Sequence, residues 1–163
     1  MTMKRLALGF LALGWIPTLA IVFGASWMHA RPLAAAARAP MKVTRLYTGA
    51  DGTTKVEEFE VPLKPQGRGT ELSEIVGVTS LQFRRTNLDY NIDRPTAPRR
   101  QYVVTLGGES EIELEGGRKL RLGPGHILLA EDTTGQGHIS RAVGSANRIS
   151  LFITLADKAT PPR

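Results

Sequence analysis

The chain has 163 residues, 42% of them apolar, which is the size and composition of one globular domain with a substantial core. It contains no cysteine, so disulfides, thiolate zinc sites, iron–sulfur clusters and cysteine nucleophiles are excluded. The formal net charge is +6, but four of the 21 basic residues and none of the 15 acidic ones lie in the first forty positions. The remaining 17 basic and 15 acidic residues nearly balance, so we expect no nucleic-acid partner.

Residues 1–40 have the three parts of a secretory signal: a basic start, an uncharged apolar run over residues 6–23, and an alanine-rich end. Ala34 and Ala36 have the spacing of a cleavage site. The competing interpretation is an uncleaved membrane anchor, because an apolar run of 18 residues is near the lower limit for spanning a bilayer. Under both interpretations the domain formed by residues 41–163 is exported, to the periplasm or the extracellular space.

From Met41 onward, short runs with a period of two residues alternate with Gly, Pro, Asn and Asp, a pattern typical of an all-β domain of antiparallel strands. Residues 87–98 are polar and contain two prolines, which indicates a loop at the mouth of a barrel. The expected strands are residues 42–47, 56–61, 78–85, 100–106, 109–114, 120–122, 126–130, 138–143 and 148–155. About nine strands predict a small closed barrel or a double sheet, since closure removes exposed strand edges.

Two spaced patterns follow each other in the second half of the chain. They consist of Gln101 and Gly108, and then of Gly117, Pro124, Gly125 and His138. The spacing resembles the motifs of the cupin superfamily, G-x5-H-x-H-x3,4-E-x6-G and G-x5-P-x-G-x2-H-x3-N, with glutamine in place of the glutamate. The resemblance covers residues 95–155 and implies a cupin-like jelly-roll β-barrel. It does not name a function, because this fold hosts many unrelated activities.

Cupins usually hold a metal on three histidines and a carboxylate, and the resemblance implies that this set is incomplete here. Where the motif has its first two histidines, the chain has Arg94 and Thr96 or, one residue later, Pro95 and Ala97. Gln101 and His138 would be the remaining ligands, and stable transition-metal sites need about three or more good ligands. His126 follows a Gly-Pro-Gly turn and joins such a site only if it leaves that turn. We therefore expect no tightly bound metal and no cofactor.

Strand alternation predicts a different kind of site inside the barrel. If Gln101 points inward, as the resemblance implies, Arg99 shares its face, and Ser140 lies inward with His138 by the same rule. The predicted ligand-binding residues are thus Arg99, Gln101 and His138. This set suits a small anion such as a carboxylate, which arginine binds through two parallel hydrogen bonds. The alternative is that Arg99 extends into solvent at the barrel rim.

Two functional hypotheses follow from these residues. The favoured one is a binding module, an exported cupin-like barrel that takes a small polar or anionic molecule without a tightly held metal. The alternative is a metal-dependent cupin enzyme of the oxygenase or isomerase type, in which His138 and Gln101 act with His126 and an acid. Asp93 and Glu131 are the acids considered for that role. Membrane attachment through residues 6–23 is compatible with both hypotheses.

Overall fold

The computed structural model describes residues 39–162. The predicted signal or anchor segment, including the apolar run 6–23, lies outside the described residues apart from Ala39 and Pro40. Residues 39–162 form twelve strands and a single turn of 3-10 helix, η1 (Glu115–Gly117), and contain no α-helix. No helix in this part of the chain is long and apolar enough to cross a membrane. The predicted all-β class is confirmed.

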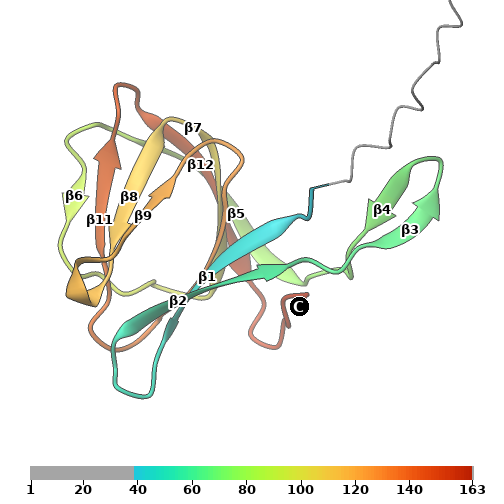
Figure 1. The fold of residues 1–163 in the computed structure, drawn as a ribbon, viewed down its shortest axis with the longest axis horizontal. Helices are drawn as coiled ribbons and strands as arrows, with labels where there is room; N and C mark the ends of the chain where they lie inside the picture. Colours follow the sequence, from blue (N-terminus) through green and yellow to red (C-terminus); the bar gives the residue numbers. More distant parts are fainter. Residues whose placement is uncertain (1–38, 163) are drawn as a thin grey trace, which may run out of the picture. The chain divides into compact units, whose positions relative to one another are not determined.

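Ten of the strands form two larger sheets, and the other two form a separate hairpin (Figure 1). The six-stranded sheet has the order β2 (Thr54–Glu60), β1 (Lys42–Thr48), β10 (Ile127–Glu131), β7 (Gln101–Gly107), β12 (Arg148–Leu155) and β5 (Val78–Thr86). The four-stranded sheet has the order β6 (Asn91–Ile92), β11 (Ile139–Val143), β8 (Glu109–Glu113) and β9 (Lys119–Leu122). The hairpin consists of β3 (Lys64–Gly67) and β4 (Thr70–Leu72).

The core lies between the two larger sheets, which face each other as two layers (Figure 1). Leu46, Val103 and Leu128 enter it from the six-stranded sheet, and Ile112 and Leu122 enter it from the four-stranded sheet. All five side chains are buried. Burial of these apolar side chains is the main force that holds one sheet against the other.

Strand β10 is the most enclosed strand of the six-stranded sheet. Leu128 packs in the core between the sheets, whereas its neighbour Leu129 packs in a second apolar cluster with Val43 and Leu155. Adjacent strand residues point to opposite faces, so β10 is covered on both faces. It pairs with β1 in parallel, which differs from the expected purely antiparallel arrangement, and parallel neighbours need a long connection. Here the connection spans most of the domain.

The structure differs from the predicted closed barrel because the two larger sheets remain separate. Strands β2 and β5 are the edges of one sheet, and β6 and β9 are the edges of the other. The loop expected over residues 87–98 contains the short strand β6, and residues 62–77, where no strand is expected, contain the β3–β4 hairpin. The hairpin was not predicted because β3 contains Pro65 and Gly67, and both residue types are unfavourable in strand interiors. The two residues of β6 are set by pairing with β11, a contact that local sequence does not reveal.

Candidate functional site

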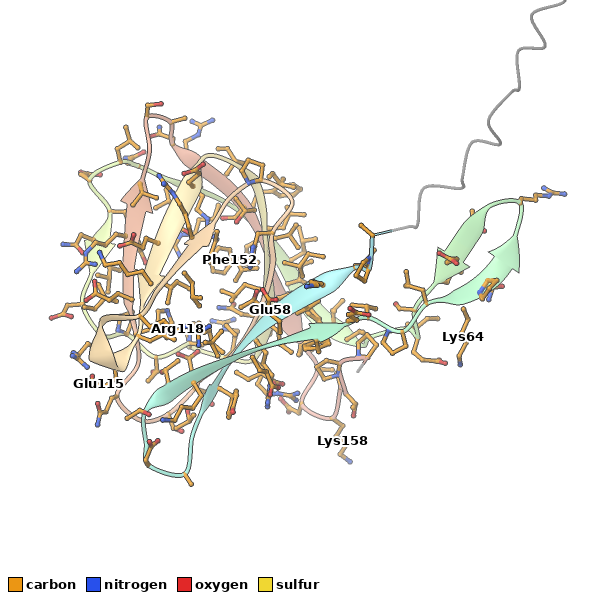
Figure 2. The ribbon with its side chains drawn as sticks, viewed as in Figure 1. Glu58, Lys64, Glu115, Arg118, Phe152 and Lys158 are labelled. Atoms are coloured by element: carbon orange, nitrogen blue, oxygen red, sulfur yellow. The ribbon has the colours of Figure 1, made fainter. Side chains whose placement is uncertain are left out.

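A cavity of about 130 Å³ lies between the two larger sheets. It is lined from both sheets and from the segment 95–98, which precedes β7. Its polar lining residues are Arg84, Thr86, Tyr90, Thr96, Gln101, His138, Ser140 and Arg148. Phe152, labelled in the interior of the domain in Figure 2, forms part of the apolar wall, whereas Glu115 and Lys64 lie at the periphery. The cavity combines positive and neutral polar groups with an apolar wall.

Arg148 is the most unusual residue of this lining. It begins β12, is only 7% exposed, and donates one hydrogen bond from Nη2 to the hydroxyl of Thr105 at 3.2 Å. Its buried Nε group has no hydrogen-bond partner among the described residues. Burial, with a further contribution from the positive charge of Arg84, lowers the pKa of Arg148 to about 10. Arg148 therefore keeps its charge at neutral pH in an environment that disfavours a charge.

Arg84 brings a second guanidinium to the same cavity from the adjacent strand β5. Arg148 pairs with Thr86, and Arg84 lies two residues from Thr86 on the same face, so the two arginines are diagonal neighbours. The Arg84 guanidinium lies over the rings of Tyr90 and Phe152, 5.0 and 5.1 Å from their centroids. Within residues 39–162, no carboxylate forms an ion pair with either arginine. This end of the cavity therefore carries two positive charges that no acidic side chain of the described residues pairs with.

His138 and Asp132 form a hydrogen-bonded pair at another part of the cavity wall. The His138 Nδ1 atom lies 2.6 Å from the Asp132 Oδ2 atom, and the Thr54 hydroxyl donates to the same oxygen at 3.1 Å. Asp132 is completely buried, and the His138 side chain is 11% exposed. With Asp132 ionised, Nδ1–H donates to the carboxylate, which fixes the tautomer that has its lone pair on Nε2.

The loop between β10 and β11 brings this pair together. Gly137 has a φ of +69°, and a Cβ atom there would lie 2.5 Å from the carbonyl oxygen of Pro95, so this position requires glycine. The close approach lets the His138 amide donate to the same Pro95 oxygen at 3.2 Å. At the start of the loop, the Ala97 amide donates to the carbonyl of Asp132 at 3.0 Å. Both ends of the loop are therefore anchored to the segment before β7.

The structure brings two of the three predicted ligand-binding residues together. Gln101 is buried at 6% exposure and lines the cavity with His138 and Ser140. The expected alternation is present in β7, where Gln101 and Val103 are buried and Tyr102 is only partly buried. Arg99 is exposed, precedes β7 and lies outside the cavity lining. Its predicted binding role is untested and stays a prediction, and the guanidiniums in the cavity come from other positions.

The sequence analysis missed Arg84, Arg148 and Asp132. Alternation along the predicted strand 148–155 could have identified Arg148, since it shares a face with the buried Ser150. The local sequence does not distinguish Arg84 from its exposed neighbour Arg85. Only the pairing of β5 with β12 places Arg84 at the cavity.

The residues considered for a metal-dependent enzyme do not meet in one place. Asp93 is exposed, and Glu131 accepts hydrogen bonds from Arg45 and Arg100, each at 2.5 Å. His126 lies outside the cavity lining, and burial lowers its pKa. Across residues 39–162, no three His, Asp or Glu side chains are grouped closely enough to hold a metal ion.

Comparisons with protein-family models and with curated proteins find no match for this chain.

Proposed function

We propose that this protein binds a small anionic molecule, with a carboxylate as its charged group, in the cavity between the two larger sheets. The ligand is held by the protein's own side chains without a tightly bound metal. The single observation that carries the proposal is Arg148, a buried guanidinium without an acidic partner among the described residues. A buried charge that lacks a partner costs several kcal/mol, which an anionic ligand offsets when it binds.

The geometry of the positive groups supports a carboxylate. The guanidinium of Arg148 makes one hydrogen bond among the described residues, from Nη2 to Thr105, which leaves Nη1 as a donor for a ligand; arginine binds carboxylates through two parallel N–H donors. Arg84 supports the same negative charge from the neighbouring strand. Gln101, Tyr90 and Ser140 offer neutral donors and acceptors for the rest of the molecule.

The size of the cavity limits the ligand. A volume of about 130 Å³ corresponds to roughly four water molecules at about 30 Å³ each. A carboxylic acid with only a few carbon atoms fits this space, and a nucleotide or an oligosaccharide does not. Phe152, Val103 and Ile112 supply apolar contact for a short carbon chain.

Thermal denaturation of the purified protein tests this proposal. Acetate, formate and pyruvate should each raise the melting temperature by several degrees when present at about 100 times their dissociation constant, relative to sodium chloride of equal ionic strength. Arg148→Met should remove the rise, and Arg85→Met, at an exposed position of β5 outside the cavity lining, is the matched control that should keep it. A rise that is equal in chloride, or one that persists in Arg148→Met, would overturn the proposal.

We also propose that the two sheets form a cupin-like jelly roll. The supporting observation is that Gln101 and His138, the two residues matched to the cupin motifs, line the same cavity. An experimental structure with a different strand order would contradict this assignment.

Export is the third part of the proposal, and it is supported by the sequence of residues 1–40 alone. Protein recovered from an exporting host should lack the N-terminal segment by intact mass if the signal is cleaved. If an anchor is retained, the protein should need detergent for extraction. Retention of residue 1 in protein that is soluble without detergent and stays in the cytoplasm would contradict export.

A further inference from the structure

The carboxylate site leaves the His138–Asp132 pair without a role, although both residues are well placed for chemistry. His138 lines the cavity that holds the two arginines, and its Nδ1 atom is engaged by the completely buried Asp132. Its Nε2 atom forms no hydrogen bond within the part of the chain that the structure describes. A neutral imidazole that is oriented by a buried carboxylate is a suitable general base.

We propose that the cavity catalyses proton transfer at the carbon next to the carbonyl of a small 2-oxo carboxylate, with His138 as the base. This inference rests on the proposed carboxylate site. The Nε2 atom of His138 takes a proton from the carbon, and the C–H electron pair forms a carbon–carbon double bond. The carbonyl π electrons move to its oxygen, which gives an enolate. Return of a proton from His138 to the carbon restores the substrate, so the step needs no oxidant or cofactor.

The other polar groups of the cavity determine the substrate class. A carboxylate held by Arg148 and Arg84 leaves the adjacent carbonyl for a neutral donor, and the amide of Gln101 lines the same cavity. The C–H bonds of a simple carboxylate are too weakly acidic for an imidazole base. A neighbouring carbonyl makes them acidic enough. A cavity volume of about 130 Å³ suits a substrate of the size of pyruvate.

Asp132 is a positioning residue in this scheme. Its Oδ2 atom accepts hydrogen bonds from His138 and from the Thr54 hydroxyl, and its backbone carbonyl is bound by Ala97. Two hydrogen bonds therefore hold Oδ2 of the carboxylate, and the backbone contact fixes the residue that carries it. The imidazole therefore keeps one tautomer and one orientation while its other nitrogen exchanges a proton.

Exchange of the pyruvate methyl protons for deuterium tests the inference directly. The full chain is incubated with pyruvate in D2O, and loss of the methyl signal is followed by proton NMR. Wild-type protein should accelerate exchange at least about tenfold above buffer, since general base catalysis contributes about a hundredfold or more. His138→Gln should exchange at the buffer rate while pyruvate still raises its melting temperature. His126→Gln is the matched histidine control and should exchange as fast as wild type.

Asp132→Asn separates positioning from a purely structural role. Its exchange rate should fall at least about tenfold, with the dissociation constant for pyruvate unchanged, because only the proton-accepting nitrogen is affected. If His138→Gln does not fold, saturating acetate in the wild type replaces it, and exchange must fall in proportion to the occupied fraction of sites.

The outcomes distinguish this inference from the binding proposal. Wild-type protein that binds pyruvate without accelerating exchange, or exchange that is unchanged in His138→Gln, overturns the proton transfer and leaves carboxylate binding intact. Protein that binds no carboxylate at all overturns both proposals.

Discussion

Two pairs of arginines in this domain have opposite surroundings. Arg45 in β1 and Arg100, the residue before β7, bind the same carboxylate, Glu131, whose side chain is 7% exposed and accepts a hydrogen bond of 2.5 Å from each. Arg84 and Arg148 line the cavity between the sheets, and no acidic side chain among residues 39–162 pairs with them.

The contrast shows how one fold uses the same residue type for stability and for binding. Glu131 pairs with both Arg45 and Arg100, and Glu57 also pairs with Arg45 at 2.9 Å, so two carboxylates balance two guanidiniums and the cluster contributes to the structure. The positive charge of Arg148 has no acidic partner among the described residues, and in our proposal a bound anion neutralises it. The difference arises at the end of β10: Glu131 is its last residue and binds the two arginines, whereas Asp132, the next residue, binds His138 at the cavity wall.

The largest effect should come from removing the acid of the neutralised cluster. Glu131→Gln removes the partner that Arg45 and Arg100 share and should lower the free energy of unfolding by about 2 kcal/mol, less than for a fully buried pair because the Arg100 side chain is 36% exposed and Arg45 keeps Glu57. Urea denaturation measures this loss. Glu58→Gln, which removes an exposed ion pair with Lys42, is the matched control and should change stability by less than about 0.5 kcal/mol. Equal losses of stability in the two variants would contradict a stabilising role of the Glu131 cluster.

Removing the uncompensated charge should have the opposite effect on the free protein. Arg148→Met should leave the free energy of unfolding unchanged or raise it, since a buried guanidinium without an acid is replaced by an apolar side chain of similar length. The same variant should weaken carboxylate binding about tenfold or more, because it loses charge-assisted hydrogen bonds of about 1.5–3 kcal/mol. A large loss of stability in the free variant would show that Arg148 has a structural role instead.

The stability that Glu131 contributes should depend on pH. Burial alone would raise the pKa of Glu131, but hydrogen bonds from Arg100 and Arg45 lower it below its ordinary value. A carboxyl group with a lowered folded-state pKa contributes stability that is complete above its unfolded pKa and is lost as the pH falls through the folded one. The stability difference between wild type and Glu131→Gln should therefore shrink between about pH 5 and pH 2, by about 1.4 kcal/mol for each unit of lowering. A difference that grows on acidification would refute this assignment.

The smallest expected effect is that of metal removal. Elemental analysis of protein from metal-supplemented medium should show well below one equivalent of iron, manganese, nickel or zinc, and a chelator should leave the melting temperature unchanged. The physical reason is that His138 is engaged by Asp132, while Glu131 is engaged by two arginines. Stoichiometric metal that disappears in His138→Ala would instead support the metal-dependent enzyme.

Local periodicity predicted the all-β class, because alternation in a strand depends on the strand alone, whereas the inward direction of Gln101 was implied by the resemblance to the cupin motifs. Strand alternation also predicted that Ser140 shares a face with His138, and both residues line the cavity. It did not predict Arg84, whose position depends on the register between β5 and β12. The separation of the two sheets likewise depends on pairings between distant strands. The predictions for residues 1–38 lie outside the described part of the chain.

Calorimetric titration of the protein with acetate tests the central claim most directly, because it reports both affinity and the number of sites. We expect saturable binding of one acetate per chain, unchanged in Arg85→Met and reduced about tenfold or more in Arg148→Met. Wild-type protein that takes up no acetate, or binding of equal strength in Arg148→Met, would contradict a carboxylate site built around the buried, unpaired guanidinium.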